Sequence, residues 1–490
     1  MNATMLGLST MLPQVLLSFA GLASLEVGAA GLADRQCEIA RYENKHRAFV
    51  LTDMSNEPDD QMSLVRLLTY SNEVDIRGIG VVTSVWKNSS IDDETVRLVI
   101  NAYGNVTESL NANSPRNAPY PQASDLLSKV HVGHPVYGLA SLQLNTSDAA
   151  HALIKAGDDA SPTSPLYVQC WGGAAVLAEA LHLVSSIRSA NATTSFVSKL
   201  RVYSISDQDD AGPWIRQHFP THSYIVSLHA FNEYSRATWN GISGELFRFF
   251  DIGGPDSSLI TNDWLQSHIR LGPLGAHYPR FDFIMEGDTP AFFPLIRNGL
   301  GDPEHPEWGN WGGRWKALDA SGKVNVFTDA TDWVVGVNGQ TYLTSHGTIW
   351  RWRREYQFDF AARMQWTLGK AYEETNHAPV AIVNGSCGPK VLEMTYKMNE
   401  TVVLDASASW DPDGDELKFK WFHYLDVTER VEGASPLPSK FVKIEDVGGN
   451  WGVVAVTPLY NHTIHIILQL EDDRDMEITT YRRVILYPTA

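Results

Sequence analysis

Short apolar runs alternate with amphipathic stretches along most of the chain. The run 47–52 (Arg-Ala-Phe-Val-Leu-Thr) predicts a buried strand, and 76–82 predicts a second one. Between them, 61–70 carries apolar side chains three and four positions apart, which predicts an amphipathic helix. The same strand-then-helix order returns at 166–183 and at 200–219. Strands joined by helical crossovers form a parallel sheet, so we expect an α/β fold with an open, mostly parallel sheet flanked by helices.

The pattern changes after Asn376. The rest of the chain consists of short runs of alternating polarity, separated by turn sequences such as Asp411-Pro-Asp-Gly-Asp and Val447-Gly-Gly-Asn. About 110 residues of this kind, with no helical period, are typical of an immunoglobulin-like β-sandwich. We therefore expect an α/β domain at 45–376 and an all-β immunoglobulin-like sandwich at 377–490.

The N-terminal segment 5–30 is apolar, is uncharged until Glu26 and ends in Gly28-Ala-Ala. It indicates a secretory signal peptide at 1–30, although it has no basic n-region. Pro13 interrupts the apolar stretch, which is then shorter than the ~20 residues that a membrane span needs. We therefore expect a secreted, extracellular protein that does not insert into a membrane.

Sequons for N-glycosylation follow this segment and support export by a eukaryotic secretory route. Their asparagines are Asn88, Asn105, Asn145, Asn191, Asn384, Asn399 and Asn461.

The chain has 3 cysteines, Cys37, Cys170 and Cys387, so disulfides cannot be its scaffold. Cys170 lies in an apolar run and is the expected buried thiol. Cys37 and Cys387 either form a disulfide or remain two free thiols, and the sequence leaves both alternatives open.

The chain is acidic, with 38 basic and 57 acidic residues and a net charge of −19. A surface of this charge repels phosphate backbones and anionic membranes, so we expect no nucleic-acid partner. The sequence also lacks a P-loop, a His-Glu-x-x-His motif and a Gly-x-Ser-x-Gly elbow. These are the usual motifs for ATP use, zinc proteolysis and serine esterase action.

The most informative motif follows the first predicted strand. Thr52-Asp53-Met-Ser-Asn-Glu57-Pro-Asp59-Asp60 places four carboxylates where the strand ends and a helix begins. That edge of an open α/β sheet is where ligands bind. Carboxylates this close repel one another unless a cation offsets them, and oxygen ligands favour Ca²⁺ or Mg²⁺. The alternative is a solvated acidic cap on the helix.

This motif resembles the signature loop of nucleoside hydrolases, Ca²⁺ enzymes that cleave N-ribosides. The sequence from Leu51 to Gln61 resembles still more closely that of a secreted group of cellulose-binding, nucleoside-hydrolase-like proteins. Further matches to that group are Gly133-His-Pro-Val-Tyr-Gly138, Trp171-Gly-Gly-Ala, Ser206-Asp-Gln-Asp-Asp-Ala-Gly-Pro-Trp214, Glu286-Gly-Asp-Thr-Pro290 and Asn298-Gly-Leu-Gly-Asp-Pro-Glu-His-Pro306. The resemblance covers nearly all of the chain after the signal segment, including the sandwich.

The resemblance implies a set of site residues. Asp53, Asp60 and Asp288 would bind Ca²⁺, and the carbonyl of Trp171 would supply a further ligand. In nucleoside hydrolases the counterpart of Asp53 also accepts the proton of a metal-bound water, and the counterpart of Asp59 binds sugar hydroxyls. A cation that lowers the pKa of a water beside a carboxylate base fits that chemistry.

The sequence also departs from the nucleoside-hydrolase pattern. Ser55 stands where the pattern has a second aspartate, and Gly287 stands where a histidine often precedes the late aspartate. The asparagine and glutamate residues that hold ribose hydroxyls are missing, and Asp207, Asp209 and Trp214 occupy the corresponding segment. The resemblance thus extends to the metal site but not to the ribose site.

Four further residues are candidates for substrate contact. His134 lies in a stretch that resembles a substrate-side loop, and its alternative is a structural histidine. Asp207 and Asp209 either line the pocket or begin the following helix. Trp311 lies in the glycine-rich run Trp308–Trp315, which predicts a loop whose indoles stack on sugar rings, while core packing is the alternative.

Three functions remain open. The first is a secreted Ca²⁺-dependent hydrolase of glycosyl bonds that acts on a saccharide with Asp53 as base. The second is a non-catalytic cellulose- or carbohydrate-binding protein with a metal-organised pocket. The third is a true ribonucleoside hydrolase, against which Gly287 and the missing ribose-binding residues count.

Overall fold

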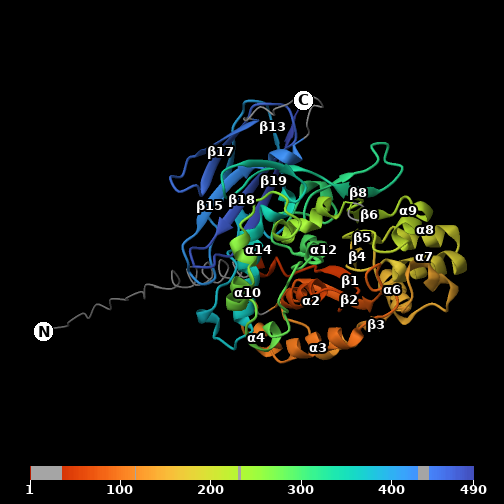
Figure 1. The fold of residues 1–490 in the computed structure, drawn as a ribbon. Helices are drawn as coiled ribbons and strands as arrows, with labels where there is room; N and C mark the ends of the chain where they lie inside the picture. Colours follow the sequence, from red (N-terminus) through yellow and green to blue (C-terminus); the bar gives the residue numbers. More distant parts are fainter. Residues whose placement is uncertain (2–35, 116, 230–232, 429–440, 490) are drawn as a thin grey trace.

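The computed structural model describes residues 1, 36–115, 117–229, 233–428 and 441–489. The expected signal peptide therefore lies, apart from Met1, outside the described residues. Figure 1 shows a larger part built on a central sheet and a smaller all-β part, coloured blue, packed on top of it. No helix in the part of the chain that the structure describes is long and apolar enough to cross a membrane.

The central sheet has eight strands in the order β3-β2-β1-β4-β5-β6-β8-β7. Every neighbouring pair is parallel except the edge pair β7 and β8. The bounds are β1 His46–Thr52, β2 Val74–Val81, β3 Val130–Val132, β4 Leu166–Cys170, β5 Leu200–Ser204, β6 Ser223–Val226, β7 Trp315–Ala317 and β8 Val326–Asp329. The open, mostly parallel sheet predicted from the strand-and-helix pattern is confirmed.

Helices cover both faces of this sheet, and the alternating side chains of β1 show the two cores. Ala48 and Val50 belong to one buried cluster, with residues of the helices 59–69, 93–104 and 353–366. Phe49 and Leu51 belong to the other, with residues of the helices 148–158, 175–187 and 211–218. A central parallel strand buried on both faces reads as a continuous apolar run, as this one does.

The helices on the two faces have the following bounds: α2 Asp59–Thr69, α3 Asp93–Gly104, α4 Thr107–Ala112, α5 Ala123–Leu127, α6 Asp148–Asp158, α7 Ala175–Ile187, α8 Ala190–Val197, α9 Ala211–His218, α10 Asn262–His268, α11 Gly272–Gly275, α12 Thr289–Phe292, α13 Gly347–Trp350 and α14 Arg353–Trp366. An additional antiparallel hairpin, β9 Asp332–Val335 with β10 Thr341–Thr344, precedes α13.

The all-β part contains two main sheets, ordered β13-β19-β18-β15 and β14-β17-β16. Their inward side chains, among them Trp421 and Val454, form a separate buried core. The bounds are β11 Ile382–Val383, β12 Ser386–Cys387, β13 Leu392–Tyr396, β14 Val402–Asp405, β15 Lys418–His423, β16 Val442–Asp446, β17 Val453–Pro458, β18 Ile464–Glu471 and β19 Thr479–Pro488. This arrangement confirms the predicted immunoglobulin-like sandwich.

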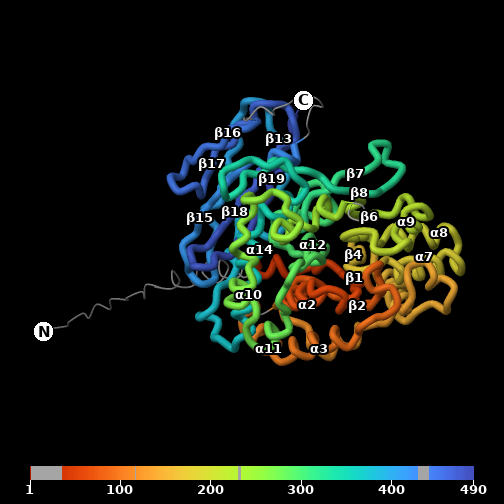
Figure 2. The backbone as a smooth tube through the Cα atoms, viewed as in Figure 1, coloured from red at the N-terminus to blue at the C-terminus, as the bar shows by residue number. Residues whose placement is uncertain are grey.

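The two parts are joined by polar and covalent contacts as well as by packing. A disulfide links Cys37 to Cys387, which decides between the two alternatives left open by the sequence, and Cys170 is a buried free thiol. The buried guanidinium of Arg483 donates to the carbonyl of Leu300 at 2.6 Å. The Tyr424 hydroxyl donates to Asp332 at 2.7 Å. In Figure 2 the sandwich lies directly against the larger part.

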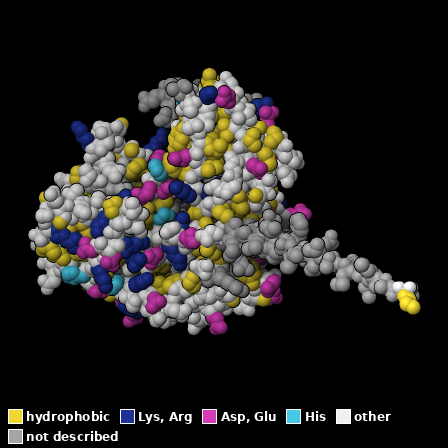
Figure 3. Space-filling view, turned by 180° about the vertical axis from the view of Figure 1, so that it is seen from behind, with side chains coloured by type: hydrophobic (Ala, Val, Ile, Leu, Met, Phe, Trp, Pro, Cys, Tyr) yellow, Lys and Arg dark blue, Asp and Glu magenta, His cyan; other side chains and the backbone are white. Residues whose placement is uncertain are grey.

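Acidic and basic side chains intermingle across the larger part on the face shown in Figure 3. On this face the carboxylates that contribute to the net charge of −19 are interspersed with basic side chains.

Candidate functional site

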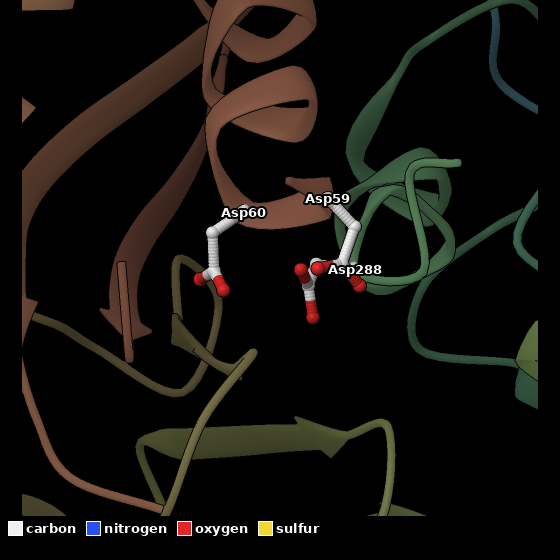
Figure 4. A group of neighbouring side chains, drawn as sticks. All are labelled: Asp59, Asp60 and Asp288. Atoms are coloured by element: carbon white, nitrogen blue, oxygen red, sulfur yellow. The ribbon is translucent and has the colours of Figure 1, made fainter. Parts of the chain in front are cut away.

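Three aspartates converge where β1 ends. Asp59 and Asp60 are the first two residues of α2, and Asp288 is the N-cap of the short helix α12. Each offers a carboxylate oxygen, and these oxygens lie within 4.8 Å of one another. Figure 4 shows the two side chains of α2 and the side chain of Asp288 directed toward the same space. We call this set the acidic group.

The acidic group is buried and has no cation partner among the described residues to offset it. The exposed fractions of Asp59, Asp60 and Asp288 are 4%, 3% and 2%. Burial, followed by repulsion from neighbouring carboxylates, raises the pKa of all three well above the ordinary value. Oδ2 of Asp288 is buried without a hydrogen-bond partner. Since a buried polar atom without a partner is costly, this geometry could hold a metal ion.

The donor set fits a hard cation. Every ligand atom in the acidic group is a carboxylate oxygen, which is the type of ligand that Ca²⁺ and Mg²⁺ take. Oxygens on opposite sides of a Ca²⁺ ion lie up to about 5 Å apart, because each Ca–O bond is about 2.3–2.6 Å long. The spread of the acidic group is within that limit.

Asp53 lies beside the acidic group but outside it. Its side chain is 3% exposed and lies within hydrogen-bonding reach of Asp60 and of the Ser84 hydroxyl. Burial raises the pKa of Asp53, although these hydrogen bonds and the charge of Lys87 partly oppose the rise. The resemblance implies Asp53, Asp60 and Asp288 as the acidic metal ligands. The structure brings oxygens of Asp59, Asp60 and Asp288 together. The role of Asp53 as a metal ligand stays a prediction.

The Trp171-Gly-Gly segment at the end of β4 packs directly against Asp53. The amide N–H groups of Trp171 and Gly172 donate to the carbonyl of Leu51 at 2.8 and 3.1 Å. A Cβ atom at Gly172 would lie 2.7 Å from Oδ1 of Asp53, so this close approach requires glycine. The carbonyl of Trp171, expected as a metal ligand, accepts a hydrogen bond from the side-chain amide of Gln208. A carbonyl oxygen has a second lone pair for another partner.

Gly287 leaves no room for the histidine of the nucleoside-hydrolase pattern. A Cβ atom there would lie 2.6 Å from Oδ2 of Asp59 and 2.8 Å from Cδ1 of Ile284. The same Cβ atom would lie 3.0 Å from the ring of Trp239. A side chain at position 287 would therefore require the Asp59 carboxylate of the acidic group to shift.

The carboxylates of Asp207 and Asp209 both accept hydrogen bonds from other residues of the protein. Asp207 forms a bidentate ion pair with Arg216, at 2.8 and 2.7 Å. Asp209 is buried and accepts the backbone N–H groups of Ala175 and Ala211, both at 3.0 Å, at the beginnings of α7 and α9. Burial raises the pKa of Asp209 to about 6. Of the two alternatives for these residues, the contacts favour organisation of the helix N-termini.

His134 is also held by the protein itself. Its Nε2 lies 2.6 Å from the carbonyl oxygen of Asn145 and 3.9 Å from a carboxylate oxygen of Glu179. Neither partner belongs to the acidic group. A role for His134 in substrate contact stays a prediction.

The expectation that Trp311 stacks on sugar rings is wrong, because its side chain is buried. Its side chain has 0% exposure, and its Nε1–H donates to the Tyr481 hydroxyl of the sandwich at 3.3 Å. It packs edge-on against Phe293 and Tyr356 as well. Of the glycines nearby, Gly309 approaches Tyr424 of the sandwich, whereas Gly312 and Gly313 approach residues of the larger part. The core alternative therefore holds for Trp311.

Two aromatic residues near the acidic group, Trp86 and Tyr234, are not predicted from the sequence. The exposed Trp86 stands edge-on to the half-buried Tyr234, with ring centroids 6.3 Å apart. Burial and then the charges of Glu57, Asp59 and Asp288 raise the pKa of Tyr234, which places its hydroxyl near the acidic group. The position of Trp86 just after β2, on the same edge of the sheet as Asp53, was a signal for it. Tyr234 lies in a 3₁₀ turn, Tyr234–Arg236, and had no such signal.

Comparison with known proteins gives the chain a family. Residues 47–315 match the model described as "Cellulose-binding Sde182, nucleoside hydrolase-like domain". Residues 401–488 match "Cellulose-binding protein Sde0182, C-terminal domain". The chain belongs to the Sde182 family. The match to the nucleoside hydrolase-like domain, residues 47–315, includes all three residues of the acidic group. No curated protein matches this Sde182-family chain.

A solved structure supports the assignment to the Sde182 family. It is a nucleoside hydrolase-related hypothetical protein from Saccharophagus degradans, described as associated with carbohydrate metabolism. It is 31% identical, covers 91% of this chain and 100% of its own, and has a TM-score of 0.73. The PKD domain of the KIAA 1837 protein is 22% identical over 20% of this chain and 82% of its own, with a TM-score of 0.14.

Proposed function

We propose that this chain is a secreted, Ca²⁺-dependent hydrolase that cleaves a glycosyl bond in a saccharide. The observation that carries the proposal is the buried acidic group, whose carboxylates converge with an unpartnered oxygen on Asp288. Asp59, Asp60 and Asp288 would hold the ion. Asp53, beside Asp60, would add a ligand on that side, and the Trp171 carbonyl would add another. A bound Ca²⁺ would lower the pKa of a water molecule and polarise sugar hydroxyls.

Asp53 is the proposed general base. It lies next to the acidic group without being one of the three converging residues, so a carboxylate oxygen remains to accept a proton. A bound Ca²⁺ would keep Asp53 ionised near neutral pH, and an ionised carboxylate beside a metal-bound water can accept its proton. The negative charge of the site would also stabilise an oxocarbenium-like transition state.

The proposed substrate is a saccharide for two structural reasons. Gly287 offers no side chain that could protonate a purine, and a Cβ atom there would lie 2.6 Å from Oδ2 of Asp59, so a larger residue would require that carboxylate to shift. Trp86 offers a flat exposed face beside Tyr234, and indole faces stack on the apolar faces of sugar rings. The relatives' description as cellulose-binding proteins agrees with a glucan or related saccharide.

Secretion fits the covalent structure. A disulfide between Cys37 and Cys387 persists in an oxidising compartment such as the secretory pathway or the extracellular space. The sequons and the apolar N-terminal segment agree with that route.

The test compares Asp53→Asn with wild type at saturating Ca²⁺. The asparagine keeps an oxygen that can contact an ion, but it cannot accept a proton. We expect turnover of p-nitrophenyl glycosides or cello-oligosaccharides to fall about 10²–10⁴-fold while Ca²⁺ binding persists. Glu57→Gln, a change of the same kind on the half-buried flank of the site, is the matched control. Equal turnover by wild type and Asp53→Asn, or turnover indifferent to chelator, would contradict the proposal.

A second candidate is carbohydrate binding without catalysis, which the family description as cellulose-binding favours. It predicts Ca²⁺-dependent retention on cellulose and no turnover of glycosides. Ribonucleosides in the same substrate panel test the third function, a true ribonucleoside hydrolase, which predicts release of free base.

A further inference from the structure

A second acidic cluster lies in the sandwich, far along the chain from the acidic group. The turn between β14 and β15 contains Asp411-Pro-Asp413-Gly-Asp415. One carboxylate oxygen from each of the three aspartates lies within 4.8 Å of the others. Gly414 has a φ of +81°, which lets the backbone turn back so that the alternate side chains point to one side.

The hydrogen bonds of the turn leave one buried oxygen without a partner. Oδ1 of Asp411 accepts the N–H groups of Asp413 and Asp415, at 2.8 and 3.3 Å. Oδ2 of the same carboxylate is buried and has no hydrogen-bond partner among the residues that the structure describes, and the residue is only 9% exposed. An ordinary turn would leave that oxygen in water, because a buried carboxylate oxygen without a partner is costly.

The surrounding cations do not reach this oxygen. The Asp413 carboxylate is held by the backbone N–H and Nδ1 of His377, both at 2.8 Å. The guanidinium of Arg474 contacts Asp415 at 2.5 Å. The fully buried Asp472 adds another carboxylate, whose charge interacts with that of Asp411. The negative charge concentrated here exceeds the positive charge of these two partners, even if His377 is protonated.

We propose that this turn binds a second divalent cation, with Ca²⁺ as the natural ligand. Asp411 supplies its buried Oδ2, and Asp413 and Asp415 supply one oxygen each. Backbone carbonyls or water complete the six to eight oxygen ligands that Ca²⁺ takes. The site stands apart from the proposed catalytic centre and does not rest on the proposed function.

The cation site would stabilise the junction between the two parts of the chain. Asp413 holds His377, and Arg474 also donates to the carbonyl of Thr375 at 3.1 Å. Asn376 donates to Asp472 at 3.0 Å. Thr375, Asn376 and His377 form the segment that connects α14 to the sandwich, so an ion in the turn fixes the geometry of that connection.

The experiment counts Ca²⁺ ions per chain by equilibrium dialysis and metal analysis on the full chain. We expect two ions in wild type and one in Asp411→Asn, with the remaining ion lost in Asp411→Asn/Asp288→Asn. Asp411→Asn is nearly isosteric and keeps an oxygen that can accept the two turn N–H groups. Asp446→Asn is the matched control, because Asp446 accepts N–H groups of Gly448 and Gly449 in an exposed turn of the same sandwich.

A second readout uses a luminescent ion in place of Ca²⁺. Tb³⁺ bound at the turn should show luminescence sensitised by Trp410, which directly precedes Asp411, and Ca²⁺ should compete it away. Asp411→Asn should lower the Tb³⁺ affinity measured by this luminescence at least about tenfold, whereas Asp446→Asn should leave it unchanged.

The outcomes separate the two sites. One ion that Asp411→Asn removes and Asp288→Asn does not would support this site and contradict the acidic group as a metal centre. Ion binding that Asp411→Asn leaves unchanged, or no ion at all, would overturn the proposal for the turn.

Discussion

Gly287 and Asp59 are so close that a Cβ atom added at Gly287 would lie 2.6 Å from Oδ2 of Asp59. Real Cβ atoms do not approach an oxygen this closely, so any side chain at this position must displace the carboxylate. The glycine that departs from the nucleoside-hydrolase pattern is thus a requirement of the acidic group in this chain.

The first prediction concerns this contact. Gly287→Ala should weaken Ca²⁺ binding at the acidic group by about tenfold or more, equivalent to ~1.4 kcal/mol, because Asp59 can no longer point toward Asp60 and Asp288. Titration calorimetry with Ca²⁺ measures the change. Gly448→Ala is the matched control, since the nearest atoms to its added Cβ lie at 3.4 Å. Equal affinities for the two variants would disprove the steric argument.

The second prediction concerns removal of the ion. Asp288→Asn should unfold at a lower temperature than wild type in Ca²⁺, because a ligand is lost, but at a higher temperature in chelator. Without an ion, the buried carboxylates of Asp59, Asp60 and Asp288 repel one another, and the amide removes one charge. Ion binding at 100 times Kd stabilises by about 2.7 kcal/mol. Thermal unfolding in both buffers provides the test, and the same order of stabilities in both would count against the metal centre.

The third prediction separates two tryptophans. Trp86→Ala should weaken binding of cello-oligosaccharides about fivefold to tenfold and leave the unfolding temperature unchanged, because its side chain is 55% exposed. Trp311→Ala should destabilise the fold by about 3–5 kcal/mol, since it leaves a cavity beside Tyr481. Calorimetric binding and denaturant unfolding measure the two effects. A stability loss in Trp86→Ala as large as that in Trp311→Ala would refute the distinction.

The fourth prediction concerns acid stability. Burial lowers the pKa of His222 from 6.5 to about 3, and both of its ring nitrogens lack hydrogen-bond partners. Between these pH values the unfolded chain binds a proton at His222 that the folded chain does not, so this histidine destabilises the fold as pH falls below 6.5. The loss should reach about 2–3 kcal/mol near pH 4.5.

The test of that effect is His222→Phe, which removes the titrating ring and should flatten the fall in unfolding free energy between neutral pH and about pH 4.5. His218→Phe, at an exposed position on α9, is the control and should keep the wild-type slope. If His222→Phe also keeps the wild-type slope, buried neutral His222 is not a source of acid lability.

Much of the fold can be predicted from the sequence, because β1 and its neighbours are continuous apolar runs and the intervening helices are amphipathic. The antiparallel strand β7 and the hairpin of β9 and β10 are not predicted, since their strands have only three or four residues and no distinct period. The sandwich is predicted by its turns and alternating polarity.

The acidic group is predicted only in part. The sequence and the resemblance bring Asp53, Asp59, Asp60 and Asp288 into one site, with Asp53 as a metal ligand and Asp59 on the sugar. They do not show that oxygens of Asp59, Asp60 and Asp288 are the ones that converge. That choice depends on the direction of each side chain in the first turn of α2. Trp311 is predicted as a binding residue because its glycine-rich surroundings are typical of a loop, and only the packing of the sandwich against the larger part reveals its burial.

A crystal structure of the protein grown with Ca²⁺ would show whether the acidic group binds an ion. We expect an ion bonded to oxygens of Asp59, Asp60 and Asp288 at about 2.3–2.6 Å, with Asp53 next to it. A map with no ion there, in which Oδ2 of Asp288 stays without a partner, would contradict it.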